Sequence, residues 1–93
     1  RSWRNELGKY KRTYDHILKG RMDSSIRFND LITLLKHLKF DLRIRGSHHI
    51  FTRTGLEEIL NFQPKDTMCK SYQVKQVRDI IIKYHIGVEA DDE

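Results

Sequence analysis

The residues of this chain best suited to chemistry lie in one short segment, in which a histidine follows two arginines. Arg43 and Arg45 alternate with apolar residues, as in a strand that has one buried face. The Gly46-Ser47 dipeptide predicts a two-residue hairpin turn, because glycine tolerates the positive φ that such a turn needs. A second strand that begins at His48 would then run antiparallel to the first.

A two-residue turn determines which residues face one another. Arg45 then pairs with His48, and Ile44 pairs with His49. Because directly opposed residues project from the same face of a sheet, His48 shares the polar face with Arg43 and Arg45. His49 falls on the apolar face. The two adjacent histidines are therefore predicted to have opposite roles, with His49 packed in the core and His48 presented to whatever the arginines bind.

A histidine flanked by cations suits the cleavage of RNA. In that reaction the 2′-hydroxyl attacks the adjacent phosphate, so a proton must leave the hydroxyl while negative charge builds on the phosphoryl oxygens. An imidazole is the natural proton carrier near neutral pH. Guanidinium groups beside it would offset the developing charge. The same pattern also fits an ordinary surface histidine, and the sequence shows no second acid or base to accompany His48.

Size and charge favour one small domain with a polyanionic partner. The chain has 93 residues, which is long enough to fold without disulfides or metals. Its formal net charge is +5. Four acids follow Val88; without them, 18 basic and 9 acidic residues remain, a charge of +9 over residues 1–88. A domain this basic suggests a nucleic-acid partner. An acidic protein is the alternative partner.

Other classes of function find little support in the sequence. No apolar run approaches the roughly 18 residues of a membrane helix, so we expect no membrane association. The lone Cys69 forms no internal disulfide, which fits a cytoplasmic protein. We expect no cofactor and no metal, because the chain has no glycine-rich phosphate loop and no spacing typical of zinc ligands.

The elements that must position His48 follow from hydrophobic periodicity. Apolar residues at helical spacing predict three helices, over residues 9–18, 30–38 and 72–85. Asn29 and Ser71 are the expected N-caps of the last two helices. The hairpin and a third strand over 56–63, which Pro64 ends, lie between them. This order predicts an α+β two-layer sandwich, a three-stranded antiparallel sheet with helices on one face, and it resembles a double-stranded-RNA-binding fold.

A second turn, at Thr54-Gly55, is expected to join the second and third strands. A two-residue loop there sets Asn61 opposite His48 and adds its amide to the polar face. The same register places Glu58 on the core face, which is an awkward position for a carboxylate.

The last helix offers a rival interface for nucleic acid. Its polar positions carry amides and cations that could enter a groove or follow a phosphate backbone: Gln73, Lys75, Gln76, Arg78 and Lys83. An ordinary solvated face is the simpler interpretation of this pattern.

The run Arg-Gly-Ser-His-His-Ile-Phe over residues 45–51 resembles the HicA family of toxin ribonucleases from toxin–antitoxin systems. Other pieces match in the same order: an amphipathic helix that ends near Phe40, the step Gln63-Pro64-Lys65, and a final helix. The resemblance covers residues 9–86 as one toxin domain. An N-terminal extension over residues 1–8 and an acidic tail over 87–93, expected to be disordered, lie outside it.

The resemblance implies an endoribonuclease that cleaves mRNA without a metal and arrests growth, with a HicB-type antitoxin as its partner. It implies that His48 is the catalytic acid/base, as the register argument also suggests. The remaining expected site residues position the histidine or hold the RNA backbone: Gly46, Ser47, Arg43, Arg45, Asn61, Lys65 and Lys70.

Two positions depart from the family pattern. Lys39 stands where the family commonly has glycine after the first core helix, and Lys65-Asp66 stands where many members have a histidine after the basic residue. A second catalytic histidine is therefore not available at that place. Two other functions stay open at this point: a non-catalytic RNA- or DNA-binding module that uses the same basic face, and a pure interaction domain for an acidic protein.

Overall fold

The computed structural model describes the backbone of residues 2–87 and the side chains of residue 8 and residues 10–87. The elements in chain order are α1 (Ser2–Lys19), the 3-10 turn η1 (Asp23–Ser25), α2 (Phe28–His37), β1 (Asp41–Arg45), β2 (His48–Thr52), β3 (Leu60–Phe62) and α3 (Ser71–Tyr84). No helix within residues 2–87 is both long enough and apolar enough to cross a bilayer.

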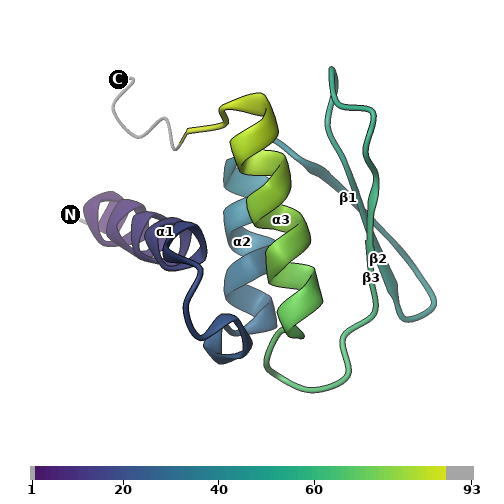
Figure 1. Ribbon diagram of the computed structural model, residues 1–93, viewed down its shortest axis with the longest axis horizontal. Coiled ribbons are helices and arrows are strands. Elements are labelled where there is room, and N and C mark those ends of the chain that lie inside the picture. Colours follow the sequence, from purple (N-terminus) through teal and green to yellow (C-terminus); the bar gives the residue numbers. More distant parts are fainter. Residues whose placement is uncertain (1, 88–93) are drawn as a thin grey trace.

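The predicted α+β architecture is confirmed. The three strands form one antiparallel sheet in the order β1-β2-β3, and α2 and α3 lie to the same side of it (Figure 1). Helix α1 packs against α2 and α3 rather than against the sheet. Because α1 runs without a break from Ser2, the helix crosses the predicted boundary between an extension over residues 1–8 and the domain that follows.

The core lies between the helix pair and the inner face of the sheet. The predicted apolar stripes of α2 and α3 supply much of it, and Phe51 and Phe62 from the sheet are fully buried against each other with ring centroids 6.0 Å apart. Burial of each such side chain stabilises the fold by about 1.5–3 kcal/mol. The buried apolar residues are Ile17, Ile26, Phe28, Leu31, Leu34, Leu35, Leu38, Phe40, Phe51, Leu60, Phe62, Cys69, Val74, Val77, Ile80, Ile81 and Ile86.

Both predicted N-caps are wrong by one or two residues. Helix α2 begins at Phe28, whose N–H donates to the carbonyl of Thr67 at 2.8 Å, so pairing between two chain segments replaces a capping side chain. Helix α3 has Lys70 at its N-cap, and the Lys70 N–H donates to Oε1 of Gln73 at 2.9 Å. That contact folds the Gln73 side chain inward. It is only 1% exposed, so the prediction that it lies on a solvated face is also wrong.

The predicted register of the first hairpin is confirmed in full, including Arg45 opposite His48 and Ile44 opposite His49. The predicted second register is wrong by two residues, because Asn61 pairs with Ile50 and the third strand covers only Leu60–Phe62. The reason is a longer connection: the turn at Gly55 is followed by residues 56–59, which do not join the ladder. A two-residue shift preserves the face of each side chain, so Asn61 stays on the polar face.

The longer connection also explains where Glu58 goes. Glu58 lies before β3, and its carboxylate accepts hydrogen bonds from Lys83 Nζ at 2.7 Å and from the Tyr84 hydroxyl at 2.6 Å, both on α3. These two contacts hold the pKa of Glu58 down, at about 2. The awkward placement of a carboxylate in the core therefore does not occur.

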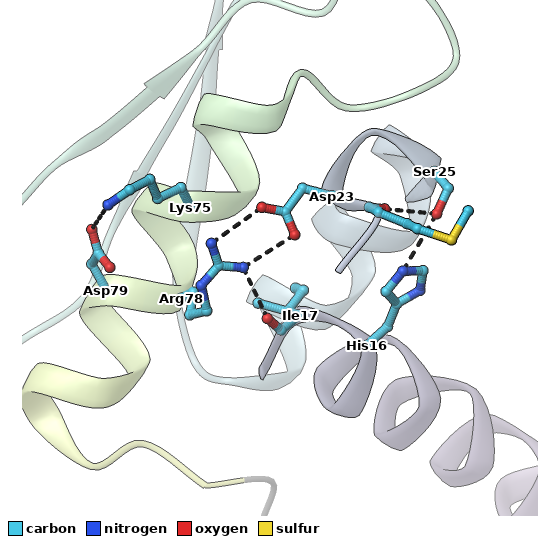
Figure 2. Close-up of polar contacts among 8 residues, drawn as sticks. His16, Ile17, Asp23, Ser25, Lys75, Arg78 and Asp79 are labelled. Carbon is cyan, nitrogen blue, oxygen red and sulfur yellow. Dashed lines mark hydrogen bonds and ion pairs between the residues drawn. The ribbon is translucent and has the colours of Figure 1, made fainter. Parts of the chain in front are cut away.

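An ion pair between largely buried side chains joins α3 to η1 and α1. The Arg78 guanidinium donates to both carboxylate oxygens of Asp23 at 3.1 Å, and its Nη1 also donates to the carbonyl of Ile17 at 3.1 Å (Figure 2). This contact links α3 to η1 and to the last turn of α1. Figure 2 also shows the exposed pair of Lys75 and Asp79 on α3.

Candidate functional site

His48 lies on the outer face of the sheet, which we call the polar face, next to the Gly46-Ser47 turn. It is the first residue of the central strand β2, with Arg45 directly opposite on β1 and Asn61 on β3 displaced by two residues from a direct pairing. These three side chains are exposed. The helices cover the opposite face of the sheet (Figure 1), so nothing within the described part of the chain shields the imidazole from a ligand.

The hydrogen bond between His48 and Asn61 determines which ring nitrogen is free. Nδ1 of His48 lies 3.0 Å from Oδ1 of Asn61. Because an amide oxygen only accepts hydrogen bonds, Nδ1 must carry the proton in the neutral ring. The lone pair is then on Nε2, and the contact also restrains the rotation of the ring. This is the arrangement that a general base requires.

Two arginines supply positive charge beside the imidazole. Arg45 faces His48 across the β1–β2 ladder, and Arg43 lies two residues further along the same strand face. A shallow groove of about 340 Å³ crosses this part of the sheet, lined by Asp41, Leu42, Arg43, Ile50 and Thr52. The lining holds one arginine and one carboxylate and includes neither His48 nor Arg45, so the positive charge next to the histidine comes from the side chains of Arg45 and Arg43 themselves. The alternation of β2 would have predicted the positions of Ile50 and Thr52, which were not among the expected site residues.

The Gly46-Ser47 turn sets the position of His48 in the way the sequence predicted. Gly46 has φ +59°, as the first position of a two-residue hairpin loop requires, and an added Cβ would meet no atom within 4 Å. Glycine is therefore needed here for its backbone conformation rather than for space. Both turn residues are exposed at one end of the polar face.

Lys65 and Lys70 lie outside the sheet, on the connection between β3 and α3. From the register, residue 63 is next to His48, so Lys65 follows just beyond the same end of the sheet. The connection is held at its far end, where the Cys69 N–H donates to the carbonyl of Ile26 at 2.7 Å. Both lysines are exposed, but no contact within the described residues brings either of them to the imidazole.

The other histidines are separated from His48. His49 points to the core side of the sheet and meets the Phe28 ring edge to face, with centroids 5.2 Å apart. His16 is on α1, His37 stacks on Tyr10 at the end of α2, and His85 follows α3. The polar face thus carries a single histidine among the described residues, as the sequence predicted.

Two other chemistries find no support in this structure. Burial raises the pKa of the Cys69 thiol to about 12, so the sulfur is held as an unreactive thiol. Within residues 2–87, no group of three or more histidine, cysteine or acidic side chains is arranged to hold a metal ion.

The rival interface on α3 is largely committed to contacts within the protein. Gln73 is buried, Arg78 is paired with Asp23, and Lys83 is bonded to Glu58. Lys75 is paired with Asp79 at 3.2 Å. The polar face of the sheet is therefore the better candidate for an interface with nucleic acid.

Comparisons of this chain with protein-family models, with curated proteins and with solved structures found no match.

Proposed function

We propose that this protein is an endoribonuclease of the HicA toxin type, with His48 as its acid/base. The observation that carries the proposal is the bond from His48 Nδ1 to Asn61 Oδ1, which leaves the lone pair on Nε2 of an exposed imidazole opposite Arg45. The same bond restrains the rotation of the imidazole ring. The α2-β1-β2-β3-α3 order supports the likeness to a double-stranded-RNA-binding fold.

In the proposed reaction the RNA backbone lies along the polar face. Nε2 of His48 takes the proton of a 2′-hydroxyl as its oxygen bonds to the adjacent phosphorus. Arg45 and Arg43 stabilise the charge that builds on the phosphoryl oxygens. The bond from phosphorus to the 5′-oxygen then breaks, and the imidazolium returns its proton to that oxygen. The products carry a 2′,3′-cyclic phosphate and a 5′-hydroxyl.

The exposure of the site limits the rate and suggests how it is controlled. An open surface cannot exclude water, so the electrostatic contribution of the arginines is weaker than in an enclosed site. One residue must also serve as both base and acid. We therefore propose a slow nuclease that acts on exposed mRNA in the cytoplasm, with a HicB-type antitoxin that covers the polar face.

The second candidate is a non-catalytic RNA-binding module, which the exposure of Arg43, Arg45 and His48 also favours. The two candidates differ in what the histidine does. A binding module uses its arginines and loses affinity steeply with salt, while the histidine is dispensable.

The deciding experiment compares the wild type with His48→Ala on a long single-stranded RNA in EDTA, with cleavage and binding measured in parallel. We expect cleavage to fall by about 10²–10⁴-fold in the variant, while RNA binding is retained. Asn61→Asp, which keeps an acceptor, should retain more activity than Asn61→Leu. His16→Ala on α1 is the matched control and should cleave like the wild type. If the wild type and every variant bind RNA but none of them cleaves it, the protein is a binding module.

A further inference from the structure

A second polar cavity lies at the opposite end of the sheet from His48. It has a volume of about 130 Å³ and is formed where α2 and α3 end and β2 leaves the sheet. Four basic side chains, together with Tyr84 and Gly87, account for most of its lining: His37, Lys39, Arg53 and His85. We call this the C-terminal pocket. Arg53 is five residues along from His48, about 17 Å in an extended strand, so the pocket is separate from the site proposed above.

Two side-chain nitrogen atoms of the residues that line this pocket have no hydrogen-bond partner. Nη1 of Arg53 and Nε2 of His37 are both buried, and neither has a hydrogen-bond partner in the structure. The His37 ring is held in place by Tyr10, with centroids 4.1 Å apart. Buried polar groups in folded proteins are nearly always paired, and an unpaired guanidinium N–H is especially unfavourable. The Arg53 N–H therefore lacks an acceptor.

The helix ends do not supply that acceptor. Cations are often found at helix C-termini because they complement the dipole. Here the carbonyls of the last turns already accept backbone bonds: Phe40 N–H donates to the Leu35 carbonyl, and Ile86 N–H donates to the Ile81 carbonyl, each at 3.0 Å. The side-chain donors of the pocket are left for another group.

The backbone at the pocket is also strained in a way that favours a role for its side chains. Lys39 has φ +74° and His85 has φ +54°, at positions after a helix that glycine usually occupies. Left-handed residues with large side chains are uncommon and gather at functional sites. Both of these residues place a basic side chain at the rim of the same cavity.

We propose that the C-terminal pocket binds an oxyanion, and that its ligand is a carboxylate from the acidic segment over residues 89–93. The described chain reaches Gly87, which itself lines the pocket, and Glu89 follows within about 7 Å of extended chain. The Tyr14 hydroxyl donates to the carbonyl of Ile86 at 2.6 Å, so the segment starts from a fixed point. Its acids are Glu89, Asp91, Asp92 and Glu93.

The dimensions and charge of the pocket fit this ligand better than RNA. A volume of about 130 Å³ holds one carboxylate or phosphate group but not a nucleotide, since pockets for small molecules start near 300 Å³. Lys39 and Arg53 provide two formal positive charges against a segment with four negative ones. The inference does not depend on RNA cleavage, because the polar face plays no part in it.

The test uses NMR of the full chain with the four acids replaced by amides: Glu89→Gln, Asp91→Asn, Asp92→Asn and Glu93→Gln. We expect the Arg53 Nε–Hε signal and the His37 imidazole signals to move relative to the wild type at low salt. Inorganic phosphate should then bind the amide variant saturably and move the same signals. In the amide background, Lys39→Gln should weaken phosphate binding about tenfold, as expected for one charged contact. The exposed Lys36→Gln, which is near the pocket without lining it, should leave that affinity unchanged.

Two results would overturn the proposal. If the pocket signals are the same in the wild type and the amide variant, and phosphate moves neither, the cavity holds only water. If the tail substitutions change nothing but phosphate binds saturably, the tail is not the ligand. Because Lys39 is exposed, its substitution leaves the fold intact and keeps the test informative even if Arg53→Gln does not fold.

Discussion

The contact of Arg78 with Asp23 gives the sharpest prediction of stability in this fold. The two side chains are only 16% and 14% exposed, and the guanidinium donates to both carboxylate oxygens and to the Ile17 carbonyl. Arg78→Met keeps most of the aliphatic volume but removes all three bonds. The Asp23 carboxylate is then left in a nearly buried position with no cation beside it.

The magnitude follows from that burial. Removing one partner of a buried ion pair costs about 3–5 kcal/mol in free energy of unfolding. Because the two side chains keep some exposure, we expect Arg78→Met to lower the free energy of unfolding by about 3 kcal/mol, the lower end of that range. The matched control is Lys75→Met on the same helix, whose pair with Asp79 is 66% and 60% exposed. We expect at most about 0.5 kcal/mol from that change, because water screens the pair.

Urea unfolding followed by circular dichroism measures both variants, with Asp23→Ala and the double variant completing a thermodynamic cycle. We expect a coupling free energy of at least about 1.5 kcal/mol between Arg78 and Asp23. Amide exchange should also accelerate in the last turn of α1, which loses its bond at Ile17. Equal losses in Arg78→Met and Lys75→Met, or a coupling near zero, would refute the reasoning that burial gives this pair its strength.

Three further predictions concern other parts of the fold. Lys39→Gly should raise the free energy of unfolding by about 1 kcal/mol, because Lys39 has φ +74° and glycine adopts that conformation without a steric penalty; urea unfolding measures the gain, and a loss would contradict it. Lys83 and Tyr84 lower the folded-state pKa of Glu58 to about 2. The Glu58 carboxylate therefore stabilises the fold above about pH 4.5, and this stabilisation is lost as the pH falls toward 2. Glu58→Gln should therefore be less stable than the wild type at pH 7 and should match it near pH 2. Cys69, whose pKa burial raises to about 12, should react with a thiol reagent at pH 8 only as fast as the protein opens, so that urea accelerates the labelling in step with unfolding.

The first hairpin shows how far local sequence alone can predict this protein. The strict alternation before Gly46, combined with a two-residue turn, predicted a single pairing register for the two strands. The structure has that register. Turn geometry and the period of two are local properties, so no distant contact was needed. The same argument placed His48 with Arg43 and Arg45, and His49 on the opposite face.

The second connection shows where that reasoning stops. Thr54-Gly55 has the appearance of a two-residue turn, but the pairing of β3 is shifted by two residues. The local sequence favours a tight turn, but the Glu58 side chain bonds to Lys83 and Tyr84 on α3 and the residues around it do not pair in the sheet. Asn61 still reached His48 because a shift of two residues keeps the face, although the contact is diagonal rather than direct.

The sequence by itself therefore determined the three core helices, the first hairpin and the face on which His48 lies, since each depends on the spacing of neighbouring residues. Only the tertiary structure decided which polar residues meet across the fold. Arg78 and Asp23 are 55 residues apart, and the C-terminal pocket gathers side chains from the ends of α2, β2 and α3. No periodicity encodes such meetings, because they depend on how whole elements pack over one core and on where their ends then fall.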